Sequence, residues 1–399
     1  MSSQARSESQ AMNAETSREL EALIRRRLDE AGGWMSFDAF MAQALYEPGL
    51  GYYESARVFG AAGDFVTAPE LGPWLSLAVA DFIQWGWEAL GRPADWSLIE
   101  QGGGSGRLLC DVMAELARRG LAPARVIAVE ASRWMRERQR EAYAAMGLDV
   151  LQTASLDEIE PRDNALYFCN ELPDAFPVRC FAWRGGAWRE RGVVWRDEQD
   201  GRDGHFAWNE RALDAPPAID ERLAAAWPDG YCSEWNPGLA TWQQALARVM
   251  PRGYALCVDY GYAASEYYRP GRSEGTLLAH VGHQAVEDVL AEPGGRDITA
   301  HVDFTALTRA GRSAGIEPAC WMPQGAWLAQ SPAVQARVGE LARAGGPEGM
   351  DDMAALRRLV MPQGMGELFK ALIQVRGAPT APPPWLERFD RLPALEHMP

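Results

Sequence analysis

Short apolar segments alternate with amphipathic helical patterns from residue 96 onward. The apolar segments are "WSLIEQ", "RVIAVE", "LDVLQTA" and "NALYFCNE", and the helical patterns "LLCDVMAELARRG" and "SRWMRERQREAYAAMG" separate the first three. Strands that are apolar along their whole length are covered on both faces, and helices between them return the chain to the same end of a parallel sheet. The pattern therefore predicts an α/β fold with a doubly wound sheet.

The N-terminal region has a different pattern. Residues 1–16 are polar, and we expect them to be disordered. Two helices are predicted in "SRELEALIRRRLDEAG" and "MSFDAFMAQALY", with Ser17 and Ser36 as their N-caps. A loop rich in glycine and proline follows, and an apolar helix is expected from about Pro69. We assign residues 17–92 to a helical and loop extension that precedes the sheet.

The alternation of strands and helices stops after residue 177. The stretch "VRCFAWRGGAWRERGVVWRDEQDGRDGHFAWNE" alternates aromatic and polar residues around Gly-Gly and Asp-Gly turns, which is typical of antiparallel strands. It predicts a β insertion over 178–236 that separates two parts of the sheet domain, 93–177 and 237–377.

The second part of the sheet domain begins with the helix "GLATWQQALARVM" and the strand "YALCVDYG". The region 262–300 has little periodicity and is predicted to be a long ordered loop with one short helix. Strands near 317–323 and 368–376, with two helices between them, would complete the sheet. Residues 378–399 form a proline-rich, irregular tail.

Composition narrows the classes of partner and compartment. The chain of 399 residues has a formal net charge of −16, which disfavours binding to phosphate backbones, so we expect no nucleic-acid partner. The longest apolar stretch, "WLSLAVADFIQWGW", is interrupted by Asp81 and is too short to cross a bilayer, so we expect no membrane insertion. The six cysteines are scattered without a CxxC pair, which is typical of a reducing compartment and predicts a cytoplasmic protein. The chain has a single lysine, Lys370.

A glycine-rich segment, "EQGGGSG", connects the first apolar strand to a helix, as in nucleotide-binding loops. A P-loop needs a lysine after its glycines, and none follows; a dinucleotide fingerprint needs a third glycine where Arg107 stands. The remaining candidate is S-adenosylmethionine, because amides at a helix start favour its carboxylate and an acid at the strand end can hold its ammonium. The residues with this spacing are Glu100, Gly102, Gly104 and Gly106.

The next two strands supply further cofactor candidates. Glu130 ends the second strand, where a carboxylate can bind both ribose hydroxyls, and Ala131 follows it. The third strand is followed by "ASLDEI", which brings Ser155 and Leu156 to the border of the adenine. The alternative interpretation is that Glu130 is a solvated acid at the end of a strand.

The fourth strand ends in "NELPDAFP", which places Asn170, Glu171 and Asp174 where ligands of such sheets bind. A methyltransferase must align its acceptor and sometimes remove a proton. Two carboxylates can hold a guanidinium in a bidentate grip, so Glu171 and Asp174 are candidate catalytic residues, and Asn170 is assigned to the cofactor side. Alternatively, the two acids only cap the loop before the insertion.

Histidines and tryptophans suggest other possibilities. His280, His283 and His301 could form a zinc site, but no cysteine lies nearby to complete a closed set of four ligands, so we expect no metal. His283 is instead a candidate loop-ordering or base residue. Tryptophans of the β insertion could dock a protein partner, and a homodimer through the insertion is compatible with the pattern.

Taken together, eight motifs make the chain resemble the MidA family between about residues 35 and 376. They are "YEPGLGYY", "GDFVTAPE", "EQGGGSG", "NELPDAFPV", "VDYGY", "GTLLAH", "DITAHVDFTAL" and "MGELFKAL". The resemblance implies a class I methyltransferase fold, Rossmann-like, that uses S-adenosylmethionine. In the mitochondrial member of the family, a complex I assembly factor, it implies symmetric dimethylation of a protein arginine.

The resemblance also assigns residues to roles. It implies that Thr67 and Glu70 of "GDFVTAPE" face the cofactor. Tyr262 and His283 are our further catalytic candidates, and either would shape the acceptor pocket beside Glu171. Three positions depart from the family pattern. Gly103 replaces a common proline and Ser105 a frequent arginine, which leaves the loop usable, whereas Tyr262 replaces a histidine, so that histidine's role does not carry over.

The sequence thus predicts an enzyme that methylates a protein side chain, arginine above all, from S-adenosylmethionine. A subunit of respiratory complex I is the acceptor that the resemblance suggests. Two alternatives remain: a methyltransferase acting on a small molecule, and an assembly chaperone that keeps the cofactor pocket without turnover. The fold alone does not decide between them.

Overall fold

The computed structural model describes residues 3–54, 71–197, 204–213, 215–281, 284–344 and 346–396. The chain divides into two compact units, each assembled from three separate segments. The sheet unit comprises Val66–Asp174, Leu239–Ala263 and Val302–Pro399; the insertion unit comprises Met1–Phe65, Ala175–Gly238 and Ala264–His301. The predicted extension 17–92 and the predicted region 237–377 therefore each contribute residues to both units.

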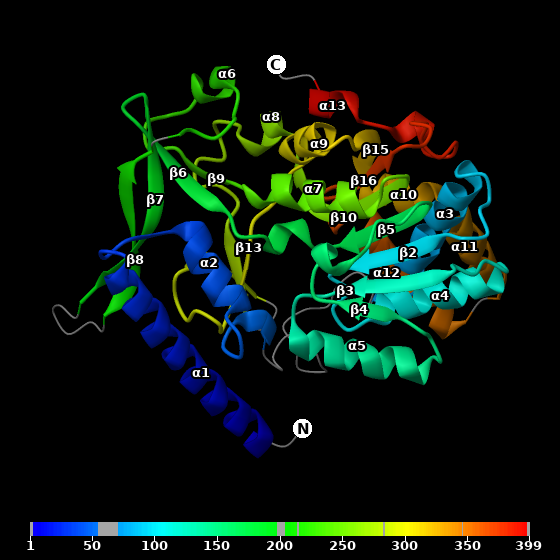
Figure 1. Ribbon diagram of the computed structural model, residues 1–399, viewed down its shortest axis with the longest axis horizontal. Coiled ribbons are helices and arrows are strands. Elements are labelled where there is room, and N and C mark those ends of the chain that lie inside the picture. Colours follow the sequence, from blue (N-terminus) through cyan, green and yellow to red (C-terminus); the bar gives the residue numbers. More distant parts are fainter. Residues whose placement is uncertain are drawn as a thin grey trace. The chain divides into compact units, whose positions relative to one another are not determined.

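The sheet unit is built on a mixed β-sheet with the strand order β15-β16-β10-β5-β2-β3-β4, in which β14 also pairs with β10 (Figure 1). Neighbouring strands from β10 to β4 run parallel, as the alternation predicted. β16 runs antiparallel to both β10 and β15, so the sheet is not wholly parallel as we expected. The strands are β2 (Ser97–Gln101), β3 (Arg125–Val129), β4 (Leu151–Thr153), β5 (Ala165–Asn170), β10 (Gly253–Tyr262), β14 (Val302–Asp303), β15 (Glu317–Pro323) and β16 (Phe369–Arg376).

Helices cover both faces of this sheet. On one face, apolar residues of α3, α4, α10, α11 and α12 pack with alternate residues of the strands, such as Leu166 and Phe168 of β5, in one hydrophobic core. On the other face, Gln243 of α7 bonds Gln374 of β16 (3.3 Å). Alternating strand residues thus face different helical layers, which accounts for their continuous apolar pattern. These helices are α3 (Trp74–Ala89), α4 (Arg107–Arg118), α5 (Arg133–Ala145), α7 (Gly238–Val249), α9 (Phe304–Ser313), α10 (Gln324–Gln330), α11 (Pro332–Ala344) and α12 (Pro347–Val360).

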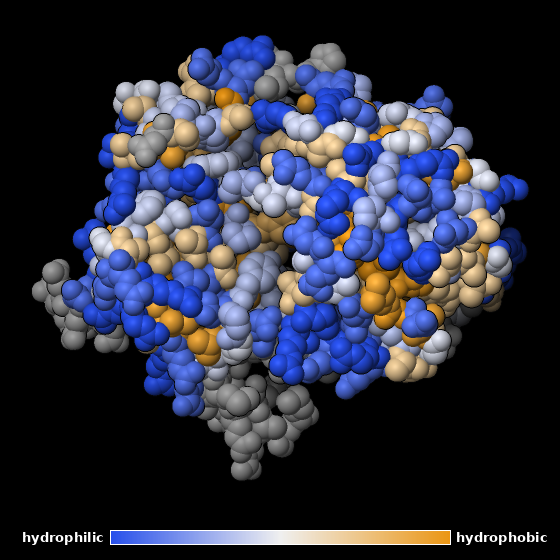
Figure 2. Space-filling model, in the orientation of Figure 1, coloured by the Kyte–Doolittle hydropathy of each residue, from blue (hydrophilic) through white to orange (hydrophobic). Residues whose placement is uncertain are grey.

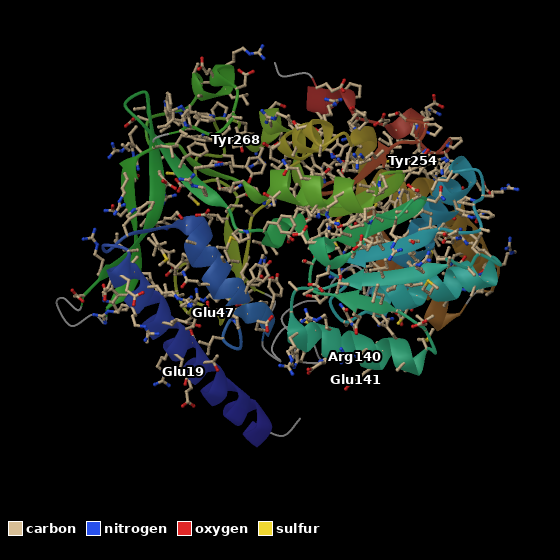
Figure 3. The ribbon with its side chains drawn as sticks, viewed as in Figure 1. Glu19, Glu47, Arg140, Glu141, Tyr254 and Tyr268 are labelled. Atoms are coloured by element: carbon tan, nitrogen blue, oxygen red, sulfur yellow. The ribbon has the colours of Figure 1, made fainter. Side chains whose placement is uncertain are left out.

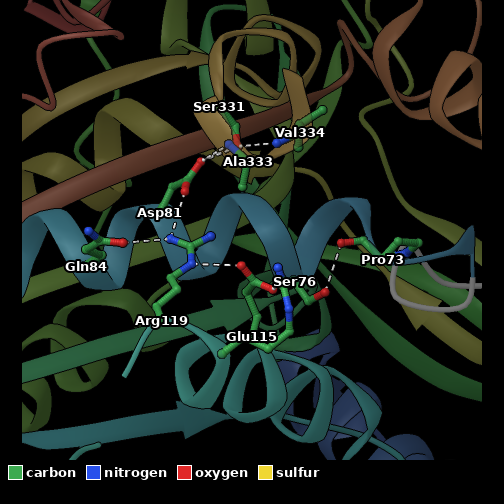
Figure 4. Close-up of polar contacts among 10 residues, drawn as sticks. Pro73, Ser76, Asp81, Gln84, Glu115, Arg119, Ser331, Ala333 and Val334 are labelled. Atoms are coloured by element: carbon green, nitrogen blue, oxygen red, sulfur yellow. Dashed lines mark hydrogen bonds and ion pairs between the residues drawn. The ribbon is translucent and has the colours of Figure 1, made fainter. Parts of the chain in front are cut away.

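Asp81, the acid inside the longest apolar stretch, connects three helices (Figure 4). Its Oδ1 accepts a hydrogen bond from Arg119, at the end of α4 (2.9 Å). Its Oδ2 accepts bonds from the Ser331 hydroxyl (2.5 Å) and the Ala333 amide (2.9 Å), at the start of α11. Because a buried carboxylate needs such partners, Asp81 holds α3, α4 and α11 together. Among the residues described, no helix is both long and apolar enough to cross a membrane.

The insertion unit holds an antiparallel sheet in the order β1-β7-β6-β9, with β8 paired to β7. A smaller sheet has the order β12-β11-β13, where we predicted a loop, because the segments around Ala279 and Ile298 are buried and pair with each other. Arg27 of α1 bonds Glu47, which follows α2 and is labelled in Figure 3 (2.6 Å). The elements of the unit are α1 (Ser3–Glu30), β1 (Met35–Ser36), α2 (Phe37–Tyr46), β6 (Arg179–Arg184), β7 (Ala187–Arg196), β8 (His205–Ala212), α6 (Glu221–Ala224), β9 (Cys232–Trp235), α8 (Ala264–Tyr267), β11 (Leu278–Val281), β12 (Gln284–Val286) and β13 (Asp297–Thr299).

Several local predictions differ from the structure. α1 begins at Ser3, whereas we expected disorder up to residue 16, and residues 3–16 contain no glycine or proline that would stop a helix. Ser17 therefore lies inside α1, where its hydroxyl donates to the Pro293 carbonyl (3.0 Å) instead of capping a helix. Ser36 does precede α2, but it makes no side-chain capping bond and pairs with Gly192 in β1. Three helices, α10 to α12, lie between the last two strands where we predicted two.

We expect the replacement Asp81→Ala to lower the free energy of unfolding by about 3 kcal/mol, because it leaves the largely buried Arg119 without this carboxylate. Urea unfolding followed by circular dichroism measures the change. Asp95→Ala is the matched control, since Asp95 is paired with Arg125 at an exposed site and its loss should cost less than about 1 kcal/mol. Equal losses in the two variants would contradict the assignment of Asp81.

Candidate active site

The turn between β2 and α4 has a backbone that needs glycine. Gly102 and Gly106 have φ of +72° and +81°, a region that side chains other than glycine rarely occupy, and Gly104 has φ of +54°. A Cβ on Gly102 would lie 2.9 Å from Cδ1 of Leu172, in the turn after β5. Gly102 thus allows the turn after β2 and the turn after β5 to approach each other closely.

Glu100 lies at the end of β2 and is only 2% exposed. Neither carboxylate oxygen has a hydrogen-bond partner among the residues that the structure describes. Burial, together with the nearby Glu130, raises the pKa of Glu100 from its ordinary value of 4.5 to about 8. A Cβ on Gly103 would overlap Oε2 of Glu100, so the glycine leaves room beside the carboxylate. A buried carboxylate with no partner is suited to binding a cationic group of a ligand.

Glu130 follows β3 and is held by α5. Its Oε1 accepts the Ser132 amide (3.0 Å), and its Oε2 faces Nε2 of Gln139 (3.4 Å). Gln139 is fully buried and also donates to the Gly104 carbonyl (3.1 Å), so it connects the glycine turn to Glu130. The Glu130 carboxylate is therefore oriented by hydrogen bonds from α5, unlike a solvated acid at the end of a strand.

Sequence reasoning missed Gln139, although a signal was present. Met135, Gln139 and Tyr143 are the buried residues of α5, spaced four apart, and a glutamine inside such a stripe needs polar partners. The other side of α5 is charged. Figure 2 shows a strongly hydrophilic surface where α5 lies in Figure 1, and in Figure 3 Arg140 and Glu141 point away from the sheet.

The parallel register brings the other cofactor candidates to the same edge of the sheet. Gln101 of β2 pairs with Val129 of β3, and Val129 with Thr153 of β4, so the residues after each strand lie next to one another. Ala131 follows Glu130, and its carbonyl accepts from Arg136 (2.8 Å). Ser155 precedes a short 3-10 turn, Leu156–Glu158, in which Leu156 is 4% exposed.

The acidic turn after β5 is fixed to the end of β10. Glu171 has φ of +49°, uncommon for a residue with a side chain, and its amide donates to the Val258 carbonyl (2.9 Å). Its Oε1 accepts from the Asn170 amide group (3.0 Å). Asp174 is 5% exposed, and its amide donates to Oδ2 of Asp259 (3.2 Å). Asn170, Glu171 and Asp174 therefore lie together in the sheet unit.

Asp259 and Tyr260 are further residues of this cluster that the sequence analysis did not select. Oδ1 of Asp259 accepts the Tyr260 amide (2.7 Å), and the Tyr260 hydroxyl donates to Oδ2 of Asp174. Burial, and then the charges of Asp174 and Glu171, raise the pKa of Asp259 well above its ordinary range. An acid inside the apolar segment "YALCVDYG" was the available signal.

Tyr262 ends β10, close to the only lysine. Lys370 of β16 is 3% exposed; its ammonium lies 5.7 Å from the centre of the Tyr262 ring and donates to the Leu368 carbonyl (3.3 Å) and the Glu367 carbonyl. Lys370 is also the register partner of Asp259. Tyr262 is thus at the same end of β10 as the residues that hold the acidic turn.

The remaining candidates belong to other parts of the chain. Thr67, Glu70 and His283 lie outside the described residues. His280 lies in β11 of the insertion unit, and burial lowers its pKa. Within the described parts of the chain, no group of three or more His, Cys, Asp or Glu side chains is arranged to hold a metal ion. The described candidates of the sheet unit therefore line the carboxyl ends of β2, β3, β4, β5 and β10.

The chain is similar to known methyltransferases. Residues 78–321 match a family described as "Putative S-adenosyl-L-methionine-dependent methyltransferase". A protein of Burkholderia thailandensis, crystallised with S-adenosyl-homocysteine, is 32% identical, with a TM-score of 0.86 over 95% of this chain and 97% of that chain. The mitochondrial protein arginine methyltransferase NDUFAF7 of Danio rerio is 26% identical over 85% of this chain and 83% of its own, and the homologue of Drosophila melanogaster is 26% identical over 85% and 80%.

We expect Glu100 to make stability depend on pH. Its carboxyl keeps its proton in the folded chain up to about pH 8 but loses it near 4.5 when unfolded, so folded Glu100 binds more protons between these values. Stability should therefore be highest below about pH 4.5 and fall, by at most about 1.4 kcal/mol per pH unit, until about pH 8.

The measurement is urea unfolding of the wild type and of Glu100→Gln between pH 5 and 9, because the difference between the two isolates this group from all others. The variant should gain stability relative to the wild type as pH rises. Parallel curves for the two proteins would contradict a buried, protonated Glu100.

Proposed function

Because this chain belongs to the MidA family of S-adenosylmethionine-dependent methyltransferases, we propose that it methylates arginine side chains of a protein. The resemblance of the motifs and the class I methyltransferase fold are both confirmed. The chain is an S-adenosylmethionine-dependent methyltransferase, and the acceptor is the part that we propose. The observation that carries the proposal is the acidic turn Asn170–Asp174, in contact with the glycine turn through Leu172.

The residues around the glycine turn fit the cofactor. The unpartnered carboxylate of Glu100 would hold its ammonium, and the first amides of α4 would face its carboxylate. Glu130, positioned by Gln139 and Ser132, would bind the ribose hydroxyls, and Leu156 would border the adenine. When bound, the cofactor supplies a methyl group on a positively charged sulfur, ready for attack by a nucleophile.

An arginine acceptor is supported by the chemistry of the turn after β5. Glu171 and Asp174 offer carboxylate oxygens, and the buried Oδ1 of Asn170 has no hydrogen-bond partner among the described residues. These groups accept hydrogen bonds, so they suit a ligand that carries both N–H donors and positive charge, as a guanidinium does. Glu171 would orient the guanidinium and take the proton that leaves its nitrogen after methyl transfer.

The names of the relatives point to the same acceptor. The similar proteins of Danio rerio, Drosophila melanogaster and Mus musculus are protein arginine methyltransferases. At 26–27% identity over 83–85% of this chain, they support a protein substrate without identifying it. We therefore propose a protein partner that presents an arginine, and the test has to identify the molecule that is labelled.

The direct test is to incubate the purified chain with S-adenosylmethionine carrying a labelled methyl group and a lysate of its own host. Label in one protein band, located on arginine by mass spectrometry, is the expected result. Label in the small-molecule fraction would overturn the protein acceptor, and label nowhere, from a folded chain that binds the cofactor, would favour a cofactor-binding assembly chaperone.

We expect Glu171→Gln to slow transfer by on the order of 100-fold or more while cofactor affinity, measured by calorimetry, changes less than about twofold, because the amide neither takes a proton nor attracts the guanidinium. Glu137→Gln, on the exposed side of α5, is the matched control and should behave as the wild type. Loss of cofactor binding together with transfer in Glu171→Gln would assign Glu171 to the cofactor site or to the fold.

A further inference from the structure

Tyr260 and Asp259 close a ring of hydrogen bonds around the acidic turn. Asp259 accepts the amides of Asp174 and Tyr260 on its two oxygens (3.2 and 2.7 Å), and the Tyr260 hydroxyl returns to Oδ2 of Asp174. The ring of Tyr260 packs against Phe369 of β16, with the ring centres 5.2 Å apart. Two consecutive residues of β10 therefore hold Asp174 by both its backbone and its side chain.

The turn needs such a clamp because its backbone is strained. Glu171 has a positive φ of +49°, and a single residue in this conformation costs on the order of 1 kcal/mol when it carries a side chain. Such a conformation persists only when neighbouring contacts determine it. The contacts that do so are the bond from the Glu171 amide to Val258 and the attachment of Asp174 to Asp259 and Tyr260.

We propose that Tyr260 is a positioning residue for methyl transfer: through its bond to Asp174 it keeps the acidic turn, and with it the Glu171 carboxylate, in the orientation that receives the acceptor. This inference rests on the proposed function. Tyr260 acts through Asp174 and needs no contact with the acceptor. A hydroxyl that donates to a carboxylate also favours its ionised form, so Tyr260 keeps the turn anionic at lower pH.

The pH dependence involves other groups that face the turn. They are the carboxylates of Glu171 and Asp259, the thiols of Cys169 and Cys257, which pair in register on β5 and β10, and the ammonium of Lys370. Removing the Tyr260 hydroxyl deletes none of these groups, but the charge of Asp174 acts on the Asp259 carboxyl, so a change of the pH profile in such a variant reports on Asp174 and Asp259 together.

The test compares Tyr260→Phe with Tyr254→Phe. Both tyrosines lie in β10, and both hydroxyls donate a hydrogen bond, but that of Tyr254 goes to the Pro379 carbonyl (2.8 Å), at the opposite end of the strand (Figure 3). We expect Tyr260→Phe to lower kcat roughly 10- to 100-fold, the effect of losing a hydrogen bond to a charged group. Its cofactor affinity should stay within about twofold, and the acid limb of its pH–rate profile should move to higher pH. Tyr254→Phe should match the wild type.

Two further measurements keep the proposal testable. In the background of Asp174→Ala, adding Tyr260→Phe should slow transfer no further, because both changes remove the same bond. Hydrogen exchange of the peptide 170–176 should be faster in Tyr260→Phe than in the wild type and in Tyr254→Phe. Equal kcat, pH profile and exchange in the two phenylalanine variants would overturn the proposal.

The exchange measurement also separates this proposal from the proposed function. If the wild type transfers no methyl group to arginine, the proposed function fails, and exchange of the turn alone then decides the role of Tyr260. Faster exchange only in Tyr260→Phe supports its positioning role, and unchanged exchange refutes it.

Discussion

The parallel pairing of β2, β3, β5 and β10 is the constraint on which the candidate site depends. No single residue near the end of one strand would form a site by itself. Because the strands run in the same direction, these residues come together at one edge of the sheet. Glu100 and Asp259 are far apart in the chain, yet both lie in strands that pair with β5. Because this edge is largely buried, an acid there either has a partner for its charge or has a raised pKa, since burial disfavours its charged form. Glu100 and Asp259 are both acids with a raised pKa.

The buried strands of the central sheet and the glycine turn were predictable from the sequence. Strands buried on both faces give uninterrupted apolar segments, and a glycine turn with three positive φ angles needs glycines at fixed spacing. Pairings between distant segments were not predictable. β1 joins the insertion sheet from residues 35–36, and β16 enters the central sheet antiparallel between β15 and β10, because both pair with strands that are distant in the sequence.

For the candidate site, the sequence identified residues at the ends of strands and missed the residues that position them through hydrogen bonds. Glu100, Glu130 and Glu171 stand at the ends of apolar segments, where an acid is conspicuous. Gln139, Asp259 and Tyr260 lie inside a helix or a strand, and their role depends on which backbone amide or carboxylate lies opposite. A polar residue at a buried position of a periodic element was the signal for the first two; Tyr260 had none, since tyrosine is ordinary in strands.

The placement of Lys370 gives the chain an unusual chemical property. Its one lysine is 3% exposed and donates to backbone carbonyls at the start of β16, so the folded surface of the sheet unit offers no lysine amine to acylating or cross-linking reagents. Because Lys370 is the only lysine in the sequence, its side chain can also serve as a specific spectroscopic probe. A nitrogen-15 label on lysine would give one side-chain signal, located where β10 and β16 meet beside the acidic turn, and that signal would register any event that loosens this end of the sheet.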